Sequence, residues 1–179
     1  RPKTAIAALT YHMLTVTSSE FDAVPWLLNV KNGVIDLRNG EMAAHEPGNR
    51  FTYCIPVDYE PGNQSAMWQG LLLDWFEGNH DMALYLQRCL GYSTTGETRE
   101  ECAFYVHGPG RSGKGTMVNT VVGLLGSALA RGVKFDLFTD AQNDPQGFRW
   151  APLRAARMIA ASESKKAERI NEGLMKQVT

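Results

Sequence analysis

The sequence predicts two consecutive units, a small α+β unit followed by an α/β unit. Two observations predict this order. Short apolar runs separated by Asn-Gly pairs come first and lead into two helical patterns. A glycine-rich loop then stands between a strand-like run and a further helical pattern. We place the boundary after residue 98, so the predicted units span 1–98 and 99–179.

The first unit is expected to open with a helix in residues 1–20 and to continue as a β-meander. Apolar runs at 25–30 and 34–37 are each followed by a turn pair, Asn32-Gly33 and Asn39-Gly40. Asn-Gly between short apolar runs is a strong hairpin signal. Residues 51–59 are a further candidate strand, which Pro61-Gly62 would close.

Two helices are expected to complete this unit. Ser65 is a candidate N-cap for a helix that runs to Phe76 and stops at Gly78. A second helical pattern starts near Asp81 and stops at Gly91, and the polar residues 92–101 then form a connection. Aromatic side chains at helical spacing are more typical of core packing than of a base-stacking surface.

Residues 107–116 carry the pattern Gly-x-x-x-x-Gly-Lys, which is typical of a loop that binds the phosphates of ATP or GTP. Glycine permits tight bends and leaves backbone N–H groups bare, and Lys114 supplies a positive charge for the β- and γ-phosphates. The candidate nucleotide-binding residues are Gly108, Pro109, Gly110, Arg111, Ser112, Gly113, Lys114, Gly115 and Thr116.

The flanking residues provide the context that this pattern requires. The apolar run 102–106 predicts a strand, and apolar residues then recur at helical spacing from Met117 to Leu125, with a stop at Gly126. A plain glycine-rich turn between a strand and a helix is the alternative interpretation at this point.

Magnesium is the expected metal. The residue after the loop lysine is normally Ser or Thr, whose hydroxyl ligates Mg²⁺. Here that residue is Gly115, so Thr116 carries the nearest hydroxyl, and it would act directly or through water.

ATP hydrolysis also needs an acidic group at the end of a neighbouring strand. The run 157–161 predicts a buried strand that ends in Ser162-Glu163. Glu163 is therefore the candidate catalytic carboxylate, together with Lys114, and a second candidate for the metal. A Glu after an apolar run is common in proteins, and the assignment of Glu163 as catalytic depends on the glycine loop that precedes it in the sequence.

Composition sets limits on function. The net charge of −1 is not that of a domain that coats DNA. No apolar run is long enough for a membrane span, and the start of the chain lacks a signal-peptide pattern, so we expect a cytoplasmic protein without membrane contact. The three cysteines have no C-x-x-C spacing, which predicts reduced thiols rather than a zinc site. The basic cluster Lys165-Lys166-Arg169, with Lys176, is typical of a solvated helix face.

The chain resembles the primase-helicases of phages and plasmids, and also those of poxviruses and other large DNA viruses. The C-terminal half of this family is a superfamily 3 helicase of the AAA+ type. The resemblance rests on an ordered set of segments: 26–30, 32–37, Gly40-Glu41, Gln87-Arg88, 90–92, Thr95-Gly96, Glu100, the loop 108–116, Arg157, Ser162-Glu163, Asn171-Glu172 and 176–179.

The resemblance implies an accessory domain ahead of an incomplete P-loop (AAA+) ATPase domain. It implies a motor that binds Mg-ATP, assembles as a homo-hexamer and translocates on single-stranded DNA during replication initiation, in a bacterial cell. By position, Lys114 would hold the phosphates, Thr116 would offer the hydroxyl for Mg²⁺, and Glu163 would be the acidic residue.

The family pattern continues past residue 179 into a sensor residue and an arginine finger, so we expect a fragment. Such a fragment would have a sheet that lacks its middle strand and would hydrolyse ATP slowly at most. Two other functions remain open. One is a P-loop phosphotransferase for a small molecule, with a lid at 131–154 that carries Arg131, Arg149 and Arg154. The other is a nucleotide-binding or oligomerisation module without turnover.

Overall fold

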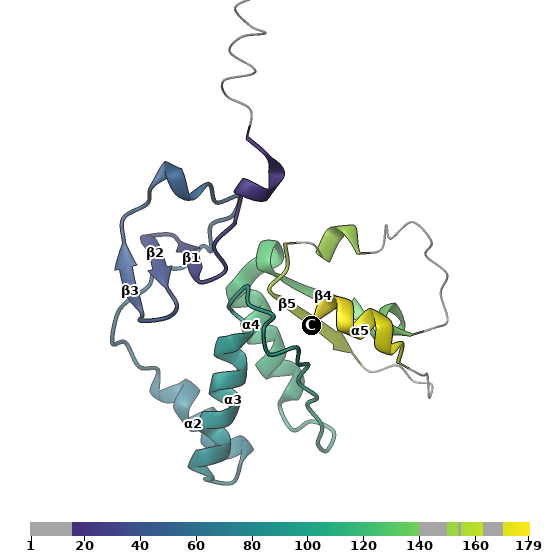
Figure 1. Ribbon diagram of the computed structural model, residues 1–179. Helices are drawn as coiled ribbons and strands as arrows, with labels where there is room; N and C mark the ends of the chain where they lie inside the picture. The colour runs from purple at the N-terminus through teal and green to yellow at the C-terminus, as the bar shows by residue number, and fades with distance from the viewer. Residues whose placement is uncertain (1–15, 140–149, 154, 163–169) are drawn as a thin grey trace, which may run out of the picture.

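The computed structural model describes residues 16–139, 150–153, 155–162 and 170–179. They form a mixed α/β structure with two small sheets. Figure 1 shows a three-stranded meander on one side of a long central helix, α4, and a two-stranded sheet on the other. The helix predicted in residues 1–20 lies mostly outside the described residues. Of that range, Ser18–Glu20 form a short 3-10 helix, η1.

The meander is confirmed. It consists of β1 (Leu27–Val30), β2 (Gly33–Asp36) and β3 (Glu41–Ala43), all antiparallel. The second turn is as predicted, with Gly40 at a φ of 75°.

The first turn differs, because Gly33 pairs with Val30 as the first residue of β2, which leaves Lys31 and Asn32 as the hairpin loop. Glycine at position 33 instead allows β3 to approach closely, since a Cβ there would lie 2.6 Å from the Ala43 carbonyl oxygen.

Residues 51–59 do not form a strand. They contact β1 through one parallel bridge, Val30 to Ile55, with hydrogen bonds from the Ile55 amide to the Asn29 carbonyl and from the Lys31 amide to the Val57 carbonyl. The Val57 amide donates to the Ile55 carbonyl of its own segment at 2.8 Å, so it does not extend the ladder to β1. Upstream, the 3-10 helix η2 (Pro47–Asn49) ends at Arg50 in the left-handed conformation.

Both predicted helices are present, with ends that differ by one or two residues. Helix α2 spans Ala66–Trp75, and the Ser65 hydroxyl accepts from the Trp68 amide as a cap. Gly78 closes this helix, because its amide donates to the Leu73 carbonyl at 2.9 Å. Helix α3 spans His80–Tyr92, so Gly91 lies inside its last turn rather than after it.

Helix α4 spans Lys114–Leu129. Gly126 interrupts it with φ 67° and ψ 175°, so the stop predicted there is confirmed as the end of the regular helix. The chain continues through β4 (Ala130–Lys134), η3 (Phe135–Phe138), η4 (Ala151–Leu153), β5 (Met158–Ser162) and α5 (Glu172–Val178). Strands β4 and β5 are parallel neighbours, with Ala130 opposite Met158 and Lys134 opposite Ser162.

One hydrophobic core joins the meander to α4. Side chains of both predicted units pack in it, so burial of apolar surface stabilises them together. Its buried members are Leu28, Val30, Ile35, Tyr53, Ile55, Val121, Leu125, Leu129 and Ala130. The domain boundary after residue 98 stays a prediction.

Candidate functional site

The glycine loop, residues 107–113, precedes the first turn of α4. Three of its residues have a positive φ: Gly108 at 155°, Arg111 at 63° and Gly113 at 85°. Glycine adopts such angles at little cost, whereas the Cβ of Arg111 makes the left-handed conformation unfavourable for that residue. The loop is therefore a tight turn whose shape depends on glycine at its two ends.

The side chain of Lys114 folds back onto this loop. Its Nζ donates to the carbonyl oxygens of Gly108 at 2.8 Å and Pro109 at 2.7 Å, and to Ser112 Oγ at 3.1 Å. A Cβ on Gly108 would lie at ordinary contact distances, 3.9 Å from this Nζ and 3.4 Å from Ser112 Oγ, so the positive φ rather than crowding favours glycine there. All three acceptors are neutral, and no carboxylate of the described chain pairs with Lys114.

The N-terminus of α4 is uncapped by any side chain. Gly113 is its N-cap, and its carbonyl accepts from the Met117 amide at 3.0 Å. In the described part of the chain, no hydrogen bond uses the amides of Lys114, Gly115 and Thr116. Free amides at a helix start, with the helix dipole behind them, attract an anion. The arrangement thus combines an uncompensated ammonium with unused backbone donors.

Thr116 lies in the first turn of α4 with an exposed side chain, and its carbonyl accepts from Thr120 Oγ1. Gly115 before it has open space where a Cβ would be. Among the described residues, no three or more His, Cys, Asp or Glu side chains stand close enough to hold a metal. The assignment of Thr116 to Mg²⁺ stays a prediction.

The strand predicted at 102–106 is absent, and this prediction was wrong. The segment runs without a ladder partner among the described strands and lies against α3, where Phe104 meets Tyr92 edge to face at 6.4 Å. A strand needs neighbouring N–H and C=O groups, and its apolar pattern alone does not supply them.

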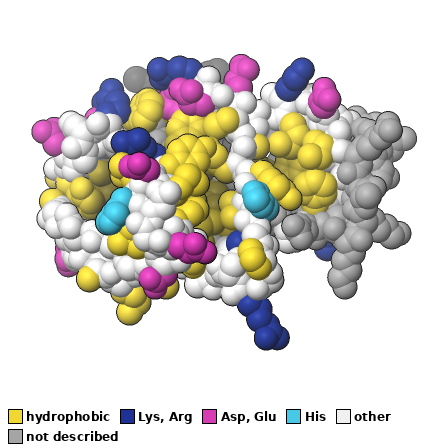
Figure 2. Space-filling view, turned by 90° about the horizontal axis from the view of Figure 1, so that it is seen from below, with side chains coloured by type: hydrophobic (Ala, Val, Ile, Leu, Met, Phe, Trp, Pro, Cys, Tyr) yellow, Lys and Arg dark blue, Asp and Glu magenta, His cyan; other side chains and the backbone are white. Residues whose placement is uncertain are grey.

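Much of this segment is exposed, with Tyr105 79% accessible. Figure 2 shows hydrophobic side chains gathered on the face of the molecule seen from below.

The strand predicted before Glu163 is present as β5, but it is not buried. Its first three residues are half-buried, and Ala161 and Ser162 are exposed. Only β4 pairs with it among the described strands, so one edge lacks a neighbour. Glu163 itself lies outside the described residues, as do Lys165, Lys166 and Arg169. The geometry between Glu163 and the loop therefore stays a prediction.

Comparison with known proteins relates the start of the chain to a family. Residues 2–77 match the family described as D5 N terminal like. This is the N-terminal part of phage and plasmid primase-helicases of the D5 type, which are replication enzymes. The match includes the meander and α2 and leaves the glycine loop outside. No curated protein matches the chain.

Arg157 connects the matched segment to the rest of the chain. Its guanidinium donates to the Leu27 carbonyl at 2.8 Å, to Tyr53 Oη at 3.0 Å and to the Thr94 carbonyl at 3.1 Å. It also lies over the Tyr53 ring, 5.6 Å from the centroid. Burial lowers the pKa of Arg157 below its usual value, while Tyr53 and Asp22 act in the opposite direction. Sequence reasoning placed Arg157 in a motif but missed these contacts, because its partners lie far away in the sequence.

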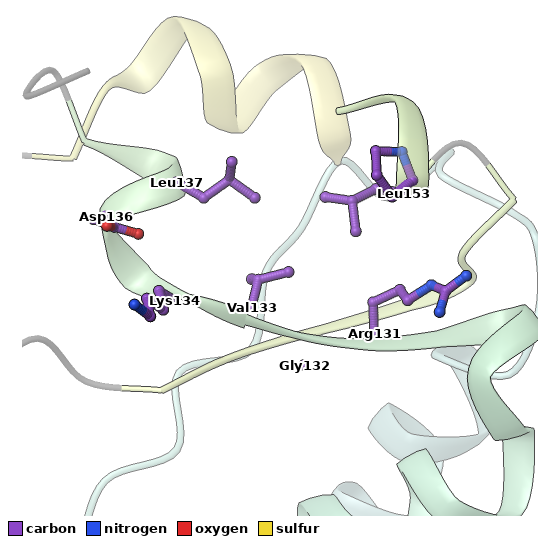
Figure 3. Close-up of a pocket in the computed structure, with 8 residues that line it drawn as sticks. Arg131, Gly132, Val133, Lys134, Asp136, Leu137 and Leu153 are labelled. Atoms are coloured by element: carbon purple, nitrogen blue, oxygen red, sulfur yellow. The ribbon is translucent and has the colours of Figure 1, made fainter. Parts of the chain in front are cut away.

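A separate hollow lies over β4, on the side where η3, η4 and α5 stand (Figure 3). Its volume is about 580 Å³, and Arg131 and Val133 line it from alternate positions of the strand. Arg131 Nε is buried and has no hydrogen-bond partner. Of the predicted lid arginines, Arg149 and Arg154 lie outside the described residues. None of the described helices is both long and apolar enough to cross a bilayer.

Proposed function

We propose that residues 107–116 bind the phosphates of ATP in a replication protein of the primase-helicase type. The observation that carries this proposal is the state of Lys114, a cation held against neutral loop oxygens beside an uncapped helix start. A positive charge that pairs with no carboxylate of the described residues, next to helix-start amides that none of their hydrogen bonds uses, fits a phosphate group. The family match of residues 2–77 supports the choice of protein class.

In this proposal the chain's own groups divide the work. The amides of the loop and of the first turn of α4 bind phosphate oxygens, and Lys114 exchanges its carbonyl partners for the β- and γ-phosphates. Thr116 and Glu163 would hold Mg²⁺, directly or through water, and the ion would supply positive charge against the phosphates. Glu163 also orients the attacking water and accepts its proton. Translocation on single-stranded DNA by a homo-hexamer belongs to the same proposal.

Lys114→Ala tests nucleotide binding. Loss of a charge-assisted contact should weaken ATP binding by roughly 10- to 100-fold, because such hydrogen bonds contribute about 1.5–3 kcal/mol. Titration of the chain with a fluorescent ATP analogue and Mg²⁺ measures the affinity. Lys31→Ala is the matched control, since Lys31 pairs with Asp58 in the meander region and should leave the affinity unchanged. Equal affinity for Lys114→Ala and the parent would refute the site.

Glu163→Gln, made in the full-length protein, tests turnover. ATP affinity should persist, whereas hydrolysis should fall by roughly 10²- to 10⁴-fold, because an amide cannot accept the proton. Stimulation of the parent's ATPase by single-stranded DNA would separate a helicase from a small-molecule kinase. Glu60→Gln, ahead of α2, is the control and should retain full hydrolysis, because the exposed Glu60 carboxylate accepts only from Asn63 in the described chain. Full activity of Glu163→Gln would show that another group performs this step.

A further inference from the structure

The indole of Trp75, the last residue of α2, lies against the glycine loop. A Cβ built on Gly113 would be 3.1 Å from Cε2 of Trp75 and closer still to Nε1, so the ring occupies the space where a side chain would stand. Trp75 lies inside the segment that matches the D5-type family, whereas Gly113 does not. The contact therefore joins the matched segment to the candidate phosphate site.

The contact falls at a sensitive point of the loop. Gly113 has a φ of 85° and is the N-cap of α4, so it is the residue where the loop turns into the helix. The next residue is Lys114, whose ammonium binds back to Gly108 and Pro109. Elsewhere in the loop, Gly110 has nothing within 4 Å of a Cβ position. Trp75 thus packs on the one loop glycine whose angle determines how α4 begins.

Helix α2 holds Trp75 in place. The ring of Trp75 packs edge to face against the ring of Trp68 in the same helix, with the centroids 6.1 Å apart. Directly after Trp75 the helix closes through the Gly78 amide and the Leu73 carbonyl. The position of the indole is therefore set by the backbone of α2 and by the ring of Trp68.

We infer that Trp75 is a positioning residue through which α2 controls the affinity of the phosphate site. This inference rests on the proposed ATP binding. Glycine-rich loops lose much conformational freedom when they bind, and packing that restricts Gly113 beforehand lowers that entropic cost. Without the indole, the entropic cost of ordering the Gly113 backbone would be part of the free energy of ATP binding. The cost corresponds to roughly a five- to thirtyfold weaker affinity.

Trp75→Leu, with Trp68→Leu as its matched control, tests the inference. Both variants remove an indole from α2, but the three atoms nearest to a Cβ position on Gly113 all belong to Trp75. Trp75→Leu should weaken binding of a fluorescent ATP analogue with Mg²⁺ roughly five- to thirtyfold, whereas Trp68→Leu should change it less than twofold. Equal losses in both variants would show that α2 acts only through its stability and would overturn the inference.

Intrinsic fluorescence gives a second measurement, because a Trp75 that only stabilised α2 would not change its emission when ATP binds. Addition of Mg-ATP should change the tryptophan emission of the parent and of Trp68→Leu, and the change should vanish in Trp75→Phe. Trp75→Phe also keeps a ring in place should Trp75→Leu fail to fold. ATP binding that both Trp75 variants leave unaltered would refute this inference alone. A parent chain that binds no ATP would refute the proposed function, and this inference with it.

Discussion

Asp36 illustrates how a single residue responds to its neighbour. Its carboxylate accepts from the Arg38 guanidinium at 2.9 and 2.6 Å and from the Arg38 amide at 3.0 Å. These side-chain and backbone hydrogen bonds lower the pKa of Asp36 from 3.8 to about 2.

Because the folded pKa is the lower one, the interaction stabilises the fold above about pH 3.8, and the contribution is lost as the pH falls towards 2. An NMR titration of the Asp36 carboxyl carbon should show this, and Arg38→Ala should return the pKa towards 3.8. An unchanged pKa in that variant would contradict the assignment.

Arg157 illustrates the larger cost of losing a buried partner. Arg157→Met would leave the Leu27 and Thr94 carbonyls without their guanidinium donor, and we expect a loss of about 2–4 kcal/mol in the free energy of unfolding. Urea denaturation measures this loss. Arg99→Met is the control, since Arg99 is exposed and pairs only with Glu97 in the described chain, and it should cost about 0–1 kcal/mol. Similar losses in the two variants would argue against a structural role for Arg157.

At the scale of elements, α4 offers a comparison between two glycines in one helix. Gly126 has φ 67° and ψ 175°, a region almost restricted to glycine, while a Cβ would meet nothing within 4 Å at either Gly126 or Gly123. Gly126→Ala should therefore destabilise the protein by about 1–3 kcal/mol through the backbone alone. Gly123→Ala should stabilise it by about 0.5–1 kcal/mol, because alanine favours the helix. Thermal unfolding of both variants checks this, and a stabilising Gly126→Ala would show that the break is not required.

The elements that sequence patterns predicted are those with local causes. Helices α2 and α4 follow from the Ser65 cap, the apolar spacing and the stop at Gly126, all of which lie within or beside each helix. The meander was predicted from short apolar runs and from the turn at Gly40, which also lie within it. The strand at 102–106 was predicted wrongly because a strand depends on a partner, and a chain segment does not reveal its own neighbour.

The candidate site divides in the same way. Residue types and spacing predicted the loop, its bends at Gly108 and Gly113, and the basic side chain at its end. They could not predict that Lys114 binds the loop's own carbonyls or that Trp75 packs on Gly113. The Lys114 contacts depend on the folded shape of the loop, and the Trp75 contact depends on how α2 meets the loop; neither follows from residue types and spacing alone.

At the scale of the whole molecule, the shared core predicts one cooperative unfolding transition. Leu125 of α4 is 2% exposed and belongs to the same core as Leu28 and Ile35 of the meander. Leu125→Ala should lower the free energy of unfolding by about 2–5 kcal/mol and shift the far-UV CD and tryptophan fluorescence midpoints equally. Two transitions, of which only one responds to the substitution, would show that the units unfold independently.

The contacts of Arg157 also have a consequence for biosynthesis. The guanidinium reaches the Leu27 carbonyl across 130 residues of sequence. A ribosome that adds about 5–20 residues per second delivers Arg157 roughly 6–26 s after Leu27. Throughout that interval the nascent meander lacks this donor, and for the larger part of it the core side chains of α4 have not yet been synthesised either. The N-terminal segment therefore completes its contacts only after Arg157, the residue before β5, has been synthesised.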